Sequence, residues 1–162
     1  MDLAEWLRAF RALHERAKRG DLSTDDHSAY VAGRDELARA LVAAQRLTVT
    51  PGSTPREVLR VARALQVDLD TPLDHLRVMT LTLSVGGFSA LLAKPPRPDE
   101  EMECILRVPG GERIETTARS VGTKPQAGSV NVSFAFGKLA DADRERLEML
   151  VFDTALQQLA NV

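Results

Sequence analysis

The sequence predicts an α+β fold that is mainly β, with helices at both ends and a small barrel or sandwich of short strands between them. Apolar residues at helical spacing occur near both ends of the chain. All eight prolines lie between residues 51 and 130, where short apolar or alternating runs are separated by turn residues. Aromatic residues make up only 4% of the 162-residue chain, so we expect an aliphatic core.

A helical hairpin is predicted at the N-terminus. The first helix ends at Gly20, which follows the basic residues Lys18 and Arg19, as is typical of a helix C-terminus. Ser23, three residues before Asp26, begins a second helix that runs to about residue 45. The side chains expected on the inner faces are Leu3, Trp6, Leu7, Phe10, Leu13, Tyr30, Leu37, Leu41 and Val42.

The hairpin and the rest of the chain are expected to form two parts, residues 1–50 and residues 51–162. The boundary is placed at TPGST, where the composition changes. A hairpin of this size buries too little apolar surface to be stable alone. We therefore expect it either to pack on the second part or to self-associate, as a homo-oligomer formed through residues 1–46.

Six strands are predicted in the second part, and their close spacing favours a small barrel or a sandwich. Each strand is followed by a segment that contains glycine, proline or aspartate. The strands are expected in ALQVDL, RVMTLTL, FSALLA, MECILRV, IETTARSV and SVNVSFAF. A C-terminal helix begins at Asp141 or Asp143, with an inner stripe of Leu147, Leu150, Val151, Ala155, Leu156 and Leu159.

Composition argues against several classes of partner. The formal net charge is -2, so no global positive field attracts nucleic acid or an anionic membrane. The segment MDLAEWLRAF is interrupted by Arg8, which predicts neither a signal peptide nor a membrane span. Cys104 is the single cysteine, which excludes an internal disulfide and favours a cytoplasmic protein.

No pattern that would support catalysis or metal binding is found. His14, His27 and His75 have no ligand spacing, and HExxH, CxxC, GxSxG and phosphate-loop motifs are missing from the sequence. Cys104 lies in an apolar run, which predicts a buried and unreactive thiol. The sequence therefore predicts a protein that is not an enzyme and that has no metal and no cofactor.

Two segments together suggest a binding site. Arg56 and Arg60 share one side of a turn or helix, where two guanidinium groups grip phosphates and stack on bases. Ser84 and Gly87 follow a strand and offer a hydroxyl and an approachable backbone. TPRE also favours a short helix over residues 55–64, in which the arginines would still share a face.

These segments resemble the motifs of the PilZ domain, the bacterial receptor module for cyclic di-GMP. REVLR at 56–60 matches the family's RxxxR motif, and TLSVGG at 82–87 aligns with its [D/N]xSxxG motif. The resemblance extends from about residue 54 to residue 160. It implies a six-stranded barrel with a C-terminal helix. It also implies a cyclic di-GMP site formed by Arg56, Arg60, Thr82, Ser84 and Gly87.

Two positions depart from the family pattern. Thr82 stands where the family has Asp or Asn, so the site has a weaker acceptor for guanine. Pro55 stands where many members that bind a ligand dimer have another arginine, which favours one ligand per chain. Two functions remain open. One is a cyclic di-GMP sensor that regulates motility, polarity, pili or exopolysaccharide through a partner protein, and the other is an adaptor that binds only protein.

Overall fold

The computed structural model describes residues 2–47, 59–110 and 112–160, and it divides into two compact units. The first comprises Met1–Leu59 and Phe152–Val162, and the second Arg60–Val151. The predicted boundary near residue 50 lies outside the described residues and stays a prediction. In the described part of the chain, none of the helices is long and apolar enough to cross a membrane.

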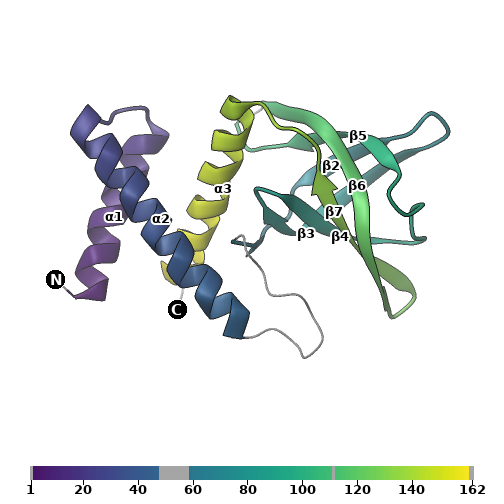
Figure 1. Ribbon diagram of the computed structural model, residues 1–162, viewed down its shortest axis with the longest axis horizontal. Helices are drawn as coiled ribbons and strands as arrows, with labels where there is room; N and C mark the ends of the chain where they lie inside the picture. The colour runs from purple at the N-terminus through teal and green to yellow at the C-terminus, as the bar shows by residue number, and fades with distance from the viewer. Residues whose placement is uncertain (1, 48–58, 111, 161–162) are drawn as a thin grey trace. The chain divides into compact units, whose positions relative to one another are not determined.

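The second unit is an antiparallel β-barrel, which confirms the predicted fold class (Figure 1). The sheet order β1-β3-β2-β5-β6-β7-β4 is closed by an additional β3–β4 pairing. All six predicted strands are present. They are β2 (Gln66–Asp70), β3 (His75–Ser84), β4 (Gly87–Leu92), β5 (Glu101–Arg107), β6 (Arg113–Gln126) and β7 (Ser129–Phe136). Barrel closure, rather than the alternative sandwich, leaves these six strands without a free edge.

Alternation of apolar residues fills the barrel interior. Inward-facing side chains from every strand are buried, including Val67, Leu83, Leu106, Ile114 and Val132, each at 0% exposure. Phe88 and Phe134 stack with ring centroids 4.9 Å apart and add aromatic packing to the mostly aliphatic core.

The sequence patterns did not predict β1 (Val61–Ala62), which pairs with β3. The alternative of a helix over residues 55–64 is therefore wrong at residues 61–62. Residues 55–58 of that segment lie outside the described residues. A two-residue strand has no periodicity of its own, and β1 exists because β3 extends far enough to pair with it.

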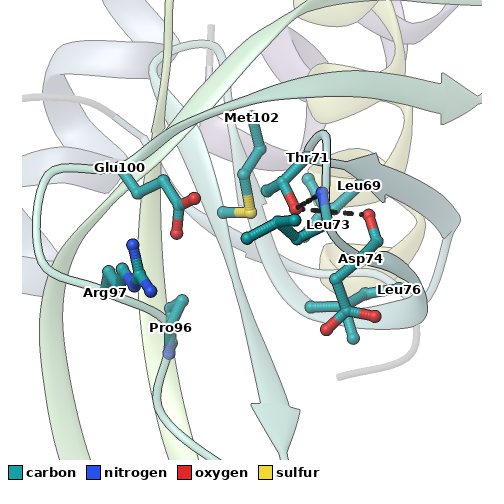
Figure 2. Close-up of a pocket in the computed structure, with 9 residues that line it drawn as sticks. All are labelled: Leu69, Thr71, Leu73, Asp74, Leu76, Pro96, Arg97, Glu100 and Met102. Atoms are coloured by element: carbon teal, nitrogen blue, oxygen red, sulfur yellow. Dashed lines mark hydrogen bonds between the residues drawn. The ribbon is translucent and has the colours of Figure 1, made fainter.

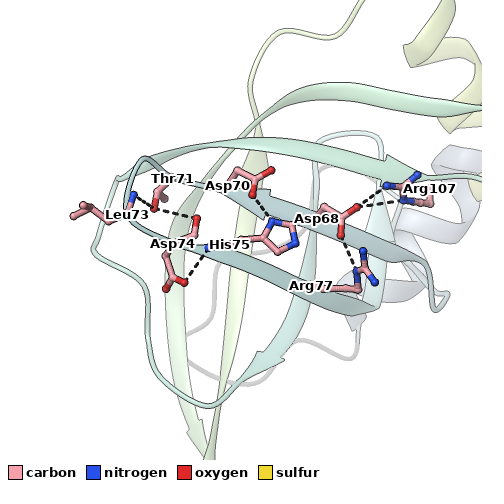
Figure 3. A network of polar contacts seen from close by, with 8 residues as sticks. All are labelled: Asp68, Asp70, Thr71, Leu73, Asp74, His75, Arg77 and Arg107. Atoms are coloured by element: carbon pink, nitrogen blue, oxygen red, sulfur yellow. Dashed lines mark hydrogen bonds and ion pairs between the residues drawn. The ribbon is translucent and has the colours of Figure 1, made fainter.

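One buried carboxylate ties three strands together on the outside of the barrel (Figure 3). Asp68 of β2 is 3% exposed and accepts hydrogen bonds from Arg107 of β5, at 2.9 and 3.2 Å, and from Arg77 of β3, at 3.1 Å. The hydrogen bonds from Arg107, which have the larger effect, and from Arg77 hold the pKa of this carboxyl below its usual value, although burial opposes them.

The first unit contains the predicted hairpin, α1 (Leu3–Lys18) and α2 (Thr24–Leu47), and the last turns of α3 (Asp141–Ala160). Gly20 adopts a positive φ of 70° just after α1, as expected for a helix C-terminus. The Ser23 hydroxyl accepts from the backbone N–H of Asp26, as the capping pattern predicted. Leu3 differs from its predicted inward position, because it is 72% exposed.

A buried polar chain links the helices of the first unit. His14 of α1 is 1% exposed, with Nδ1 2.8 Å from the Tyr30 hydroxyl and Nε2 3.3 Å from Asp153. Lys18 Nζ also contacts Asp153, at 2.8 Å. Burial lowers the pKa of His14, although Asp153 opposes this effect. Because Tyr30 is also only 2% exposed, the His14–Tyr30 part of this chain is closed to solvent and contributes to the packing of the helices.

Candidate functional site

The β3–β4 bend contains the Ser–Gly motif, and Ser84 holds it closed. The Ser84 hydroxyl accepts from the backbone N–H groups of Gly86 and Gly87, both at 3.2 Å, and donates to the Gly87 carbonyl at 3.3 Å. A hydroxyl has one donor and two acceptor positions, so all of them are used within the bend. Ser84 therefore fixes the conformation of the motif.

Gly87 is required by the sheet itself. It pairs with Ala135 of β7, and a Cβ atom at this position would lie 2.0 Å from the Phe134 carbonyl oxygen. No side chain fits without moving the β7 backbone. At Gly86 a Cβ would meet nothing closer than the Ser84 hydroxyl oxygen, at 3.8 Å. The barrel thus needs glycine at position 87 whether or not a ligand binds.

Thr82 lies beside this bend and is partly buried. It pairs with Ser89 of β4, and the two hydroxyl oxygens are 2.6 Å apart, with either one able to donate. Ser89 was not identified from the sequence, because its role depends on strand register. Its hydroxyl is placed to orient whatever side chain occupies position 82.

Strand β1 brings the arginine motif to the bend. Val61 pairs with Leu83 and Ala62 with Thr82. Arg60 directly precedes Val61, so its backbone enters β1 next to the residue that pairs with Leu83, the neighbour of Ser84. The end of the arginine motif and the start of the Ser–Gly motif, far apart in the sequence, therefore lie on neighbouring strands. Arg56 lies outside the described residues.

Thr80 clamps the connection between β1 and β2. It is 2% exposed, and its hydroxyl accepts from the backbone N–H of Leu65 at 2.8 Å and donates to the carbonyl of Arg63. The backbone of Thr80 also donates to the Leu65 carbonyl at 2.9 Å. These bonds hold the chain directly after β1, so Thr80 positions the segment that carries Arg60. No local sequence pattern predicts this role.

The bend suits an anionic ligand with planar bases. Residues 79–93 carry no charged side chain, so Arg60 brings a positive charge to a neutral hairpin. Guanidinium groups bind phosphate in bidentate geometry and stack on bases. The Thr82–Ser89 hydroxyl pair offers hydrogen bonds to a base edge. This combination supports binding and contains no nucleophile activated by a base.

The other chemically notable residues do not join this cluster. Cys104 is 1% exposed, and burial followed by the charge of Asp68 raises its pKa to about 12, as expected of an unreactive thiol. His75, at the start of β3, contacts Asp70. Within the described ranges, no three His, Cys, Asp or Glu side chains come together in a way that could hold a metal ion.

Similar folds occur among solved structures. The Bacillus subtilis inhibitor of motility, MotI/DgrA, is 21% identical to this chain with a TM-score of 0.58, and the match covers 65% of this chain and 53% of MotI. The Escherichia coli YcgR PilZ domain with c-di-GMP is 18% identical with a TM-score of 0.56, and the match covers 67% of this chain and 100% of that domain. The K. pneumonia MrkH–c-di-GMP complex is 13% identical with a TM-score of 0.61, and the match covers 68% of this chain and 57% of MrkH.

This chain thus spans about half the length of MotI and of MrkH, and the likeness to all three concerns the fold. No curated protein sequence matches the chain. The sequence model of the PilZ domain matches residues 53–153, which include both motifs and every strand of the barrel. The chain therefore belongs to the PilZ domain family.

Proposed function

We propose that this protein is a non-enzymatic, cytoplasmic sensor of cyclic di-GMP that regulates motility, polarity, pili or exopolysaccharide through a partner protein. The observation that supports the proposal is the β1–β3 register, because Val61, the residue after Arg60, pairs with Leu83, the residue before Ser84. YcgR and MrkH are described with c-di-GMP, and MotI is described as an inhibitor of motility. These relatives support the ligand class and the kind of output.

The residues have different roles in this proposal. Arg60, with Arg56 by the sequence motif, binds the phosphates and stacks on guanine. Thr82 contributes the acceptor for the guanine N–H donors, oriented by Ser89. Ser84 and Gly87 shape the bend on which the base rests, because the Ser84 hydroxyl is already used within it. Pro55 favours one ligand per chain.

A second function is favoured by Thr82 and by the closed bend. An adaptor that binds protein only would retain Ser84 and Gly87, because the hairpin needs both without any ligand. Its contacts would come from the helices or the outer face of the barrel. Leu3, 72% exposed on α1, supports self-association through residues 1–46 as one such contact.

Calorimetric titration of the full chain with cyclic di-GMP separates these functions. We expect Arg60→Ala to weaken binding about 10–150-fold, because charged hydrogen bonds contribute about 1.5–3 kcal/mol each. Thr82→Asp should strengthen binding about 5–150-fold by supplying the carboxylate acceptor. Arg97→Ala is the matched control, because this exposed arginine lies in the loop before β5, at the other end of the barrel.

Two results would contradict the sensor proposal. The first is no heat and no shift in melting temperature near a millimolar ligand, which would leave the adaptor function. The second is full affinity in Arg60→Ala, which would mean that the ligand binds elsewhere.

A further inference from the structure

The end of the barrel opposite the Ser84–Gly87 bend holds an open pocket of about 240 Å³ (Figure 2). It lies between the β2–β3 turn and the loop that precedes β5. The ten residues of β3 connect the two ends, so about 30 Å of extended strand separate pocket and bend. A ligand at the bend does not reach this pocket.

The pocket has an apolar floor and an apolar lip. Leu69 and Met102, 1% and 2% exposed, form the floor. Leu73, at the tip of the β2–β3 turn, is 88% exposed. A single exposed leucine is ordinary, but one that borders an apolar pocket extends a surface that a partner can cover. The volume is below the roughly 300–1,000 Å³ of pockets for drug-sized ligands, so it suits a side-chain anchor.

The two loops that border the pocket carry more negative than positive charge, although only Asp74, Glu100 and Arg97 among their charged residues line the pocket itself. In residues 70–74 and 94–103, six carboxylates and two cations give a local net charge of -4, while the whole chain carries -2. The six are Asp70, Asp74, Asp99, Glu100, Glu101 and Glu103. Asp70 contacts His75 (Figure 3). In the described part of the chain, Glu100, Glu101 and Glu103 form no ion pair.

The side chains are arranged to receive an apolar group with charges around it. Leu73 and Met102 lie between Glu100 and Arg97 on one side and Asp74 on the other (Figure 2). An acidic rim attracts a cationic partner and repels nucleotides and nucleic acid. A second copy of this chain would place carboxylates against carboxylates across a two-fold axis, which is unfavourable.

We propose that this pocket is a docking site for a cationic segment of a partner protein that inserts one aliphatic side chain beside Leu73. The aliphatic group packs on Leu69 and Met102, and lysine or arginine residues on either side pair with the carboxylates of the rim. The site does not depend on cyclic di-GMP, because it lies at the other end of β3.

Methionine methyl NMR on the full chain tests this directly. The probe is a 12-residue synthetic peptide with one leucine flanked by lysines, compared with a leucine-to-serine version and a version with glutamates in place of the lysines. We expect the lysine–leucine peptide to shift the Met102 methyl signal saturably, and Met79 and Met149 to stay unchanged. Both altered peptides should bind at least fivefold more weakly, and added salt should weaken binding.

Substitutions at the two ends of the barrel test the pocket and the cyclic di-GMP site independently. Leu73→Ser removes an exposed side chain without disturbing the core and should weaken peptide binding at least fivefold. Val121→Ser, at a 56% exposed position on β6, is the matched control and should leave it unchanged. Arg60→Ala should retain peptide binding, and Leu73→Ser should retain any response to cyclic di-GMP, so failure of one proposal leaves the other testable.

Three results would overturn the docking site. The Met102 signal could stay unmoved at millimolar peptide. The glutamate peptide or the serine peptide could bind as well as the lysine–leucine peptide. Light scattering could find a dimer that Leu73→Ser abolishes, which would assign the pocket to a second copy.

Discussion

Different kinds of contact stabilise the barrel and the helical unit internally. In the barrel, Gly87 lies against the backbone of Phe134, and the Thr80 hydroxyl bonds two backbone groups. In the helical unit, Gly33 lies against the ring of Phe10, and side chains such as His14 and Asp153 make the links. Backbone contacts cannot adjust by rotamer changes. We therefore expect added side-chain atoms to cost more stability at the motif end of the barrel than in the helical unit.

The same contrast applies to polar groups. The Tyr30–His14–Asp153 chain looks more like a catalytic site than the Thr82–Ser84 hairpin, yet His14 and Tyr30 are sealed from solvent. The hairpin has only hydroxyls and backbone groups, and Thr82 beside them is partly accessible. What a polar cluster can bind thus depends on access as much as on residue type.

The largest expected effect comes from Gly87→Ala. Its Cβ would lie 2.0 Å from a backbone oxygen, so β4 and β7 must separate, and we expect a loss of about 3 kcal/mol in the free energy of unfolding. Urea denaturation followed by circular dichroism measures it. Gly86→Ala is the matched control in the same bend and should change stability little. Equal stability of the two variants would contradict the close approach of β4 and β7.

Gly33→Ala sharpens the contrast between the units. Its Cβ would lie 2.9 Å from the Phe10 ring, which must move, while the gain in helix propensity of about 1 kcal/mol offsets part of the strain. We expect Gly33→Ala to lower the free energy of unfolding by less than Gly87→Ala does. The single tryptophan, Trp6, stacks on Phe10 at 5.4 Å and reports this unit by fluorescence. A larger loss than in Gly87→Ala would contradict the comparison.

An intermediate effect is expected for Thr80→Val. The substitution keeps the shape but leaves the Leu65 N–H and the Arg63 carbonyl without the hydroxyl, at a cost of about 1–3 kcal/mol. Because these bonds hold the chain after β1, cyclic di-GMP affinity should also fall, although Thr80 faces the barrel interior. Thr116→Val is the control, because it removes a half-exposed β6 hydroxyl that donates a single hydrogen bond, to the Lys138 carbonyl, far from β1. Unchanged affinity in Thr80→Val would mean that β1 needs no clamp.

The smallest effect is a difference in acid sensitivity. Burial lowers the pKa of His14 from 6.5, so the unfolded chain takes up the proton first, and stability falls as the pH drops below about 6.5. Arg107 and Arg77 lower the pKa of Asp68 from 3.8, so the stability that it provides is lost only below about pH 4. Urea unfolding followed by Trp6 fluorescence should therefore show a lower stability of the helical unit at pH 5.5 than at pH 7.5. His14→Gln should remove this pH dependence. The same dependence in His14→Gln would exclude His14 as its source.

Local patterns predicted most of the fold. The six strands and the three helices follow from apolar periodicity and from turn residues, all of which act over a few neighbours. The choice of a barrel over a sandwich came from the resemblance to PilZ domains. Leu3 was predicted inward because it continues the stripe of Phe10, but it lies in the first turn and is 72% exposed.

The site was predicted only where a motif marks it. Arg60, Thr82, Ser84 and Gly87 belong to the matched patterns. Thr80 and Ser89 could not be found in the same way, because their roles arise from the bulge between Thr80 and Thr82 and from the pairing with β4. Strand register is a property of the assembled sheet and has no signature in a single strand.

A crystal structure of the full chain with cyclic di-GMP tests the central claim most directly. We predict phosphate oxygens within hydrogen-bond distance of the Arg60 guanidinium and a guanine edge at Thr82, with the Ser84–Gly87 bend unchanged. A nucleotide bound away from this hairpin, with Arg60 turned from it, would contradict the account.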